Sequence, residues 1–177
     1  MKTLVLTAAA VTLLAACSTI SVDTDYDKTA DFSQYQTFDW APPAAMRIAG
    51  EYNQLTDQRI RAALTDALSA KGIEHTPGNP QLLVAFHTGV RERTEVVNTG
   101  WGGGYSGYGY WPGYGHSGIE TRNYTEGTLM VDLIDAGERR LVWRGKAVGV
   151  VGDYESQESR IREAVMEMFK KYPPALK

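Results

Sequence analysis

Two segments of the chain, residues 55–72 and 155–172, carry the same amphipathic helical pattern, and this pair constrains the fold most strongly. In each segment the apolar residues recur at spacings of three and four, which places them on one stripe of a helix. The stripes are Ile60, Ala63, Leu64, Ala67 and Leu68 in the first segment and Ile161, Ala164, Val165, Met168, Phe169 and Tyr172 in the second. Each stripe must be buried, so the chain needs a second layer against which both helices pack.

Segments with strand character supply that second layer. They alternate apolar and polar residues or form apolar runs of strand length. The segments are 18–27, 35–40, 81–87 with a continuation to 96–97, 125–135 and 141–151. Residues 136–139, with Gly137, are expected to form a hairpin turn between the last two. We therefore predict an α+β domain with a mostly antiparallel sheet and two amphipathic helices packed on one face.

The ends of the predicted helices carry matching signals. Thr56 is expected to cap the start of the first helix, and Gly72 stands where a C-terminal cap glycine belongs. Pro173 and Pro174 end the second helix.

The start of the chain resembles a secretory signal. Lys2 provides a positive charge, and an apolar run over 4–16 follows it. This run is shorter than the roughly 20 residues needed to cross a bilayer core. An uncleaved anchor or a buried segment is the alternative; we expect residues 1–16 to be a signal peptide.

Cys17 is the only cysteine, and it follows the apolar run directly. Leu14-Ala15-Ala16-Cys17 resembles the bacterial lipobox, which implies cleavage before Cys17 and three acyl chains, palmitate among them, on this residue. Two chains already anchor a protein stably. An ordinary cleavage site that leaves a free thiol is the alternative. Ser18, rather than an aspartate, follows the cysteine, and by the same resemblance this favours the outer membrane, facing the periplasm.

The remaining chain suits one domain. We assign residues 17–24 to the lipid-attachment cysteine and a short tether, and residues 20–174 to a single α+β domain with an insertion at 98–118. The formal net charge of -3 does not favour nucleic acid as a partner.

The insertion at 98–118 is rich in glycine and aromatic residues. Its aromatic residues are Trp101, Tyr105, Tyr108, Tyr110, Trp111 and Tyr114. Tyrosine and tryptophan rings can stack on sugar faces, or they can form an adaptable protein-binding surface. An exposed, flexible spacer between two strands is the alternative.

The polar residues do not form a recognisable catalytic or metal-binding motif in the sequence. The three histidines, His75, His87 and His116, lack the spacing of a helical metal site. We therefore predict no metal, no cofactor and no catalytic residues. Trp143 shares a strand face with Leu141 and is expected in the core, whereas Arg144 points to the opposite face, where we expect it to pair with Asp132 across the hairpin.

Short motifs along the whole chain resemble one family. They are Asp25-Tyr26-Asp27, Phe32, Tyr35, Thr37-Phe38, Trp40, Leu82-Leu83-Val84 after Pro80, Glu126-Gly127-Thr128-Leu129 with Val131-Asp132, Leu141-Val142-Trp143-Arg144-Gly145, and Tyr172-Pro173-Pro174. In this order they are similar to the bacterial envelope lipoproteins grouped as domain of unknown function 4136. The resemblance implies a lipoprotein of the Gram-negative envelope, and it supplies no catalytic residues.

The sequence thus favours a non-enzymatic envelope lipoprotein that is held on the membrane through Cys17 and binds a protein, glycan or lipid partner. One alternative is an envelope enzyme or peptidoglycan-binding protein that uses the aromatic segment as its platform. Another is an accessory lipoprotein of a lipid or export transporter.

Overall fold

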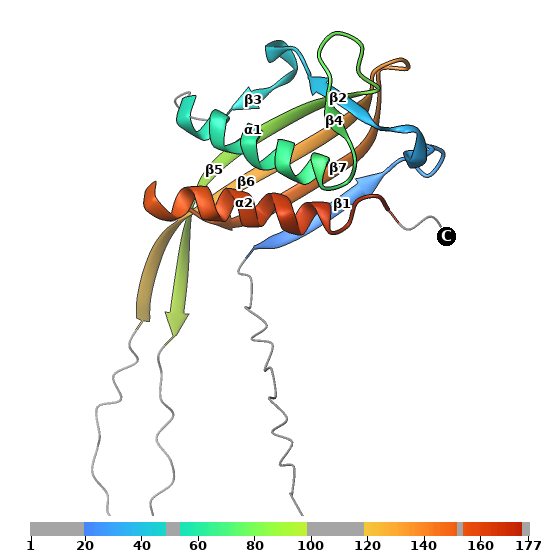
Figure 1. Ribbon diagram of the computed structural model, residues 1–177. Coiled ribbons are helices and arrows are strands. Elements are labelled where there is room, and N and C mark those ends of the chain that lie inside the picture. Colours follow the sequence, from blue (N-terminus) through green and yellow to red (C-terminus); the bar gives the residue numbers. More distant parts are fainter. Residues whose placement is uncertain (1–19, 49–53, 99–118, 152–153, 175–177) are drawn as a thin grey trace, which may run out of the picture.

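The computed structural model describes residues 20–48, 54–98, 119–151 and 154–174, and they form one sheet with two helices (Figure 1). The strands are β1 (Ser21–Tyr26), β2 (Thr37–Trp40), β3 (Arg47–Ile48), β4 (Glu74–His75), β5 (Leu82–Asn98), β6 (Ile119–Asp135) and β7 (Arg140–Val150). The helices are α1 (Gln54–Ser69) and α2 (Tyr154–Phe169), with short 3-10 turns at Phe32–Gln34 and Pro43–Ala45.

The sheet has the order β1-β7-β6-β5-β2-β4, and β3 pairs with β5 beside β2. The pairs β1–β7, β7–β6 and β6–β5 are antiparallel, whereas β2 and β3 run parallel to β5, and β4 runs parallel to β2. The predicted α+β class and the mostly antiparallel sheet are thereby confirmed.

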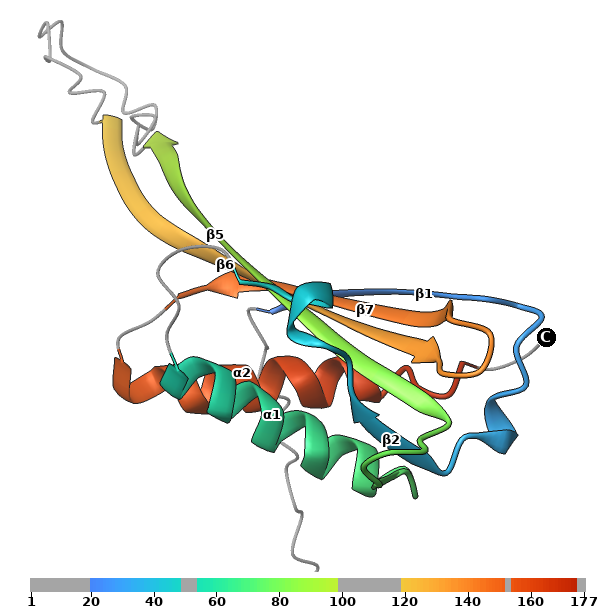
Figure 2. The same ribbon diagram turned by 90° about the horizontal axis from the view of Figure 1, so that it is seen from above.

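The core lies between the sheet and the helices. On β5 and β6 every second residue points into it, namely Leu82, Val84, Phe86, Leu129, Val131 and Leu133. Both predicted helical stripes contribute buried residues to the same cluster, such as Leu64 from α1 and Val165 from α2. Figure 2 shows α1 and α2 side by side on the same side of the sheet.

Trp143 lies in this core, as predicted, and Gly145 makes room for it. A Cβ atom at Gly145 would lie 2.5 Å from Trp143 Cη2 and 2.9 Å from Met168 Sδ. In Trp143-Arg144-Gly145 the first and third residues therefore face the core, where the Trp143 ring fills the space that a side chain at position 145 would need. Arg144, between them, faces the opposite side of the sheet.

Several elements differ from the predictions. α2 ends at Phe169, whereas the sequence predicted a helix up to Tyr172 that Pro173 ends. Thr56 lies inside the first turn of α1, where its hydroxyl bonds to Gln157 rather than capping the helix, so that prediction is wrong. Gly72 does adopt the left-handed conformation of a helix cap, with φ 77°. β6 begins at Ile119 rather than at residue 125, and the two-residue strands β3 and β4 were not predicted.

β5 and β6 extend far beyond the rest of the sheet. The residues Ser21, Val148, Thr128 and Gly89 form one row across β1, β7, β6 and β5. Past this row β7 continues only to Val150, opposite Glu126, whereas β5 and β6 remain paired from Val90↔Gly127 to Asn98↔Ile119, a length of about 30 Å at roughly 3.3 Å per residue. We call residues 90–98 and 119–127 the ribbon, and both views show it projecting from the body (Figures 1 and 2).

Candidate functional site

A row of charged residues crosses the sheet on the face opposite the core. Asp25 of β1, Arg144 of β7 and Asp132 of β6 are register neighbours. Arg144 Nε donates to Asp132 Oδ1 at 2.6 Å, and Nη2 donates to Oδ2 at 2.7 Å. This two-point ion pair confirms the pairing that the hairpin spacing predicted.

Asp132 is the buried member of the row, since only 5% of its surface is exposed. His87 of β5 approaches the same carboxylate, with Nε2 3.4 Å from Oδ2. The hydrogen bonds to Asp132 raise the pKa of Arg144 above its ordinary value, burial opposes this, and the charges of Asp132 and Asp25 add to it. The row therefore keeps the guanidinium charged and orients it on the face of the sheet.

The geometry of this row suits structural support better than catalysis. Both oxygens of Asp132 are already engaged by Arg144, so the carboxylate is poorly placed to accept a proton from a substrate. Among the residues placed by the structure, no three His, Cys, Asp or Glu side chains gather as a metal site would require.

A second polar feature lies inside the aromatic cluster around Trp143. The side chain of Tyr172 packs edge-to-face on Trp143, with ring centroids 5.6 Å apart. Trp143 Nε1 and the Tyr172 hydroxyl are buried, and neither has a hydrogen-bond partner among the described residues. Burial raises the pKa of Tyr172 to about 12, so its hydroxyl stays protonated at neutral pH and does not serve as a base.

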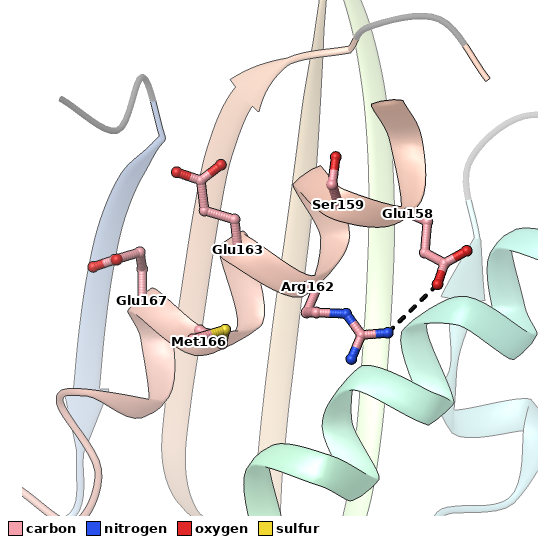
Figure 3. A pocket seen from close by; sticks show the side chains of 6 residues that line it. All are labelled: Glu158, Ser159, Arg162, Glu163, Met166 and Glu167. Carbon is pink, nitrogen blue, oxygen red and sulfur yellow. Dashed lines mark hydrogen bonds and ion pairs between the residues drawn. The ribbon is translucent and has the colours of Figure 1, made fainter. Parts of the chain in front are cut away.

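A shallow depression runs along the outer surface of α2 (Figure 3). It is lined by Glu158, Ser159, Arg162, Glu163, Met166 and Glu167. Arg162 points toward α1 and pairs with Glu158 at 3.4 Å, and the Ser159 hydroxyl donates to the Ser156 carbonyl. A serine bonded to its own helix backbone lacks the adjacent base that a nucleophile needs.

The ribbon presents two faces of different character. On one face Arg93 pairs with Glu126 at 3.4 Å, and Glu95 and Arg122 lie opposite each other in the register. We call this the charged face. The other face carries Val90, Thr94, Val96, Thr121, Asn123 and Thr125, with Glu92 as its charged residue. We call it the neutral face, and the Thr94 hydroxyl donates to Asn123 Oδ1 across it at 2.9 Å.

Exposed large apolar residues gather at the end of the molecule from which the ribbon projects. Val90 and Val96 of the ribbon are 60% and 63% exposed. Val150 and Val151, where β7 ends, and Leu55, in the first turn of α1, are exposed as well. This gathering was not predicted, because Leu55, Val90, Val96 and the pair Val150-Val151 lie far apart in the sequence and only the fold brings them to one end.

The site residues predicted from the sequence lie outside the described residues. Cys17 precedes Ile20, where the description begins, by three positions. The aromatic residues at 101–114 belong to the segment that joins the two ends of the ribbon, Asn98 and Ile119. The fold thus fixes where these segments leave the body.

Together these features define a small α+β protein with a helix-packed sheet, a projecting two-stranded ribbon and a row of paired charged residues across the sheet. The chain belongs to the family described as Domain of unknown function (DUF4136), which matches residues 22–174. The family resemblance seen in the sequence motifs is thereby confirmed.

Solved structures from bacteria are similar to this chain at low sequence identity. A PDZ domain protein from Parabacteroides distasonis is 18% identical with a TM-score of 0.53, and the match covers 88% of this chain but only 36% of that protein. The PelC dodecamer from Paraburkholderia phytofirmans is 10% identical with a TM-score of 0.48, over 84% of this chain and 94% of that one. A minor lipoprotein from Acinetobacter baumannii is 10% identical with a TM-score of 0.39, over 77% and 91% of the two chains.

No curated protein matches the chain by sequence. Within the part of the chain that the structure describes, neither helix has the length and apolar character that crossing a bilayer requires.

Proposed function

We propose that this protein is a non-enzymatic lipoprotein of the bacterial envelope, anchored through Cys17 at the periplasmic face of the outer membrane. The observation that carries the proposal is the sequence Leu14-Ala15-Ala16-Cys17 at the end of a short apolar run. Membership of a family that matches residues 22–174 agrees with a folded domain beginning directly after such an anchor.

The non-enzymatic part of the proposal is supported by the polar groups that the structure places. The buried carboxylate of Asp132 is held by Arg144, and the Ser159 hydroxyl is held by its own helix. Neither forms the nucleophile–base pair that acyl transfer or hydrolysis needs. The module would act by binding, and its partner would be an envelope protein or a glycan.

The aromatic segment is the proposed partner contact. Its rings, Trp101, Tyr105, Tyr108, Tyr110, Trp111 and Tyr114, belong to the segment that joins the two strands of the ribbon. Aromatic rings bind both sugar faces and protein surfaces. The alternative with support in this segment is peptidoglycan binding.

The anchor is tested by replacing Cys17 with serine in the full chain, expressed in a Gram-negative host. The wild-type chain should carry an acylated residue 17 by mass spectrometry and fractionate with the outer membrane, whereas Cys17→Ser should lose both properties. Ser18→Ala serves as the matched control, because it leaves the cysteine in place. Unchanged membrane fractionation of Cys17→Ser, with no acyl mass on the wild type, would refute the anchor.

The partner contact is tested with a chain in which the six aromatic residues at 101–114 become serine and the length is kept. If the segment binds a glycan, this variant loses co-sedimentation with purified peptidoglycan while its circular dichroism is unchanged. If it binds a protein, crosslinking in intact envelopes loses a specific product instead. Unaltered sedimentation and crosslinking together would show the segment to be a spacer.

A further inference from the structure

The ribbon has an outer edge along β5 that is open within the described part of the chain. β3 is the strand that borders β5 nearest to the ribbon, and its pairing stops at Thr88. From Val90 to Asn98 the strand that pairs with β5 is β6, on the other side. Figure 2 shows the ribbon bending away from the helix layer, so α1 and α2 do not cover this edge. The edge is therefore accessible to another strand.

The backbone groups that point out of this edge follow from the register. Thr125 of β6 is the register neighbour of Glu92, and its carbonyl accepts from Val151 N at 2.8 Å, on the side away from β5. Two residues opposite each other in an antiparallel pair turn their backbone groups either toward each other or both outward. Glu92 therefore points its N–H and C=O outward, and so do Thr94 and Val96, because the register continues without a shift.

The outer strand β1 shows what a protected edge looks like in the same sheet. Lys171 Nζ donates to the Val22 carbonyl at 2.6 Å, and Asp25 Oδ1 accepts from Tyr26 N at 2.9 Å. Proteins commonly block their open edges with such charged side chains, with proline or with bulges, because an open edge invites another strand. The stretch 90–98 of β5 contains no proline and no shift of register. It has the properties of a surface that pairs.

The charges along this edge are complementary to those of a second copy. When two copies of one strand pair antiparallel about a twofold axis, the central residue faces itself and its two neighbours face each other. A centre at Glu92, Arg93 or Glu95 sets like charges directly opposite, which is destabilising. A centre at Thr94 sets Arg93 of each chain opposite Glu95 of the other, which is stabilising.

Both charged residues are available for these contacts. Arg122, the register neighbour of Glu95, pairs with Glu120 of its own strand at 3.4 Å, and Glu95 forms no ion pair within the described residues. Arg93 pairs with Glu126 at 3.4 Å, but 48% of its side chain is exposed. A second carboxylate can therefore reach the Arg93 guanidinium.

We infer that two copies of this chain associate through the β5 edges of their ribbons, antiparallel and centred on Thr94. Glu92 of each chain then lies opposite Val96 of the other, and the outward groups of positions 92, 94 and 96 exchange about six backbone hydrogen bonds. Val90 lies opposite Asn98, so the paired stretch ends before Thr88, where β3 occupies the edge. The two bodies lie at opposite ends of a joint four-stranded ribbon.

The strength of this association depends on concentration. A two-stranded ribbon is marginally stable alone, and joining two of them gives the larger sheet that such strands need. One pair of edges is nevertheless a smaller contact than the interfaces of stable dimers, so we expect the copies to separate in dilute solution. Confinement to a membrane raises their effective concentration. This step rests on the proposed anchor at Cys17.

The pairing is tested by disulfide trapping of the full chain in intact envelopes. Thr94→Cys places two cysteines opposite each other, with Cα atoms about 5.5 Å apart, which suits a disulfide. Val96→Cys is the matched control on the same edge, since it is 63% exposed but lies four residues from its copy, about 13 Å away. Thr121→Cys reports on the outer edge of β6. The wild-type chain shows any dimer that Cys17 itself forms.

The expected result is a disulfide-linked dimer for Thr94→Cys and little or none for the other two variants. Equal yields at 94, 96 and 121, a dimer at 121 alone, or a crosslink to a different protein in place of the dimer would overturn the pairing. So would the absence of a dimer from a Thr94→Cys chain that carries the acyl mass, and the anchor would then stand. The same absence in a chain without acyl mass would overturn the anchor, and the membrane-dependent pairing with it.

The register is tested by reversing one charge at a time in the Thr94→Cys chain. Arg93→Glu sets glutamate opposite glutamate, and Glu95→Arg sets arginine opposite arginine, so each variant alone should lose most of the dimer. When the two variants are coexpressed with different tags, every glutamate again faces an arginine, and a mixed dimer should form. Unchanged dimer yields in the single variants, or no mixed dimer from chains with unaltered circular dichroism, would overturn the register centred on Thr94.

Discussion

At the scale of single residues, Asp132 is a buried carboxylate on whose ion pair the stability of the fold depends. Replacing Asp132 with alanine leaves Arg144 and His87 without the carboxylate that they share. Because 42% of the Arg144 side chain is exposed, water takes over part of its solvation. We expect a loss of about 1–3 kcal/mol in the free energy of unfolding, measured by urea denaturation.

The matched variants are Arg144→Ala and the double variant of both residues. If the ion pair is responsible, the double variant loses less free energy of unfolding than the two single variants added together. Additive costs would show that Asp132 acts through packing alone.

Asp39 makes the stability of the protein depend on pH. Its carboxylate accepts the backbone N–H of Trp40 at 2.7 Å and of Gly78 at 3.2 Å, and it lies 3.3 Å from His75 Nε2. The bond from Trp40, then those from Gly78 and His75, lower the pKa of Asp39 below 3.8, against the effect of burial. A lowered pKa in the folded state stabilises the protein above the ordinary value, and this contribution disappears as the pH falls through the folded pKa.

Asp39→Asn should therefore be less stable than the wild type at neutral pH, and the difference should shrink as the pH falls below 3.8. Thermal unfolding from neutral to acidic pH measures this difference. Asp31, whose pKa is lowered by its own bonds to Ser33, is left in place in both chains. A difference that stays constant over the whole pH range would contradict the assignment to Asp39.

At the scale of secondary-structure elements, the sequence predicted what depends on hydrophobic periodicity. Both helices appear, and most residues of their predicted stripes are buried, since a spacing of three and four is visible without knowledge of the partner layer. β3 and β4 have two residues each, too few for any period to be recognised. The first part of β6, residues 119–124, was not predicted as strand, because polar residues occupy both faces where the ribbon has no core beneath it.

The same distinction applies to the polar residues. The pairing of Arg144 with Asp132 was predictable, because opposite charges stand across a hairpin on the face away from the core. The approach of His87 to Asp132 depends on the register of β5 with β6, which no local pattern determines.

The ribbon should exchange its amide hydrogens faster than the body. Beyond residue 92 each strand has only one neighbour and no core, and such two-stranded ribbons are marginally stable on their own. In hydrogen-exchange mass spectrometry of Cys17→Ser in solution, peptides covering 92–96 and 120–124 should exchange at least as fast as any other strand. Peptides covering 82–88 of the same β5 are the internal control, since that part is buried between neighbours. Equal protection of the two parts would mean that the ribbon is covered in solution.

At the scale of the whole molecule, one core cluster joins both helices to the sheet. Leu64 of α1, Val165 of α2 and Leu133 of β6 all belong to it, and each is fully buried. Because the helices and the sheet share this core, unfolding of any one of them exposes the buried side chains of the others to water. The body should therefore unfold as a single cooperative unit.

Leu64→Ala tests this coupling. The cavity left by a fully buried leucine costs about 2–5 kcal/mol, and helix content and the fluorescence of buried tryptophan should both shift to the same lower urea midpoint. Leu55→Ala on the same helix, where the side chain is 60% exposed, should barely move either midpoint. If Leu64→Ala moved the circular dichroism midpoint and left the fluorescence midpoint in place, the helices would unfold separately from the Trp143 region.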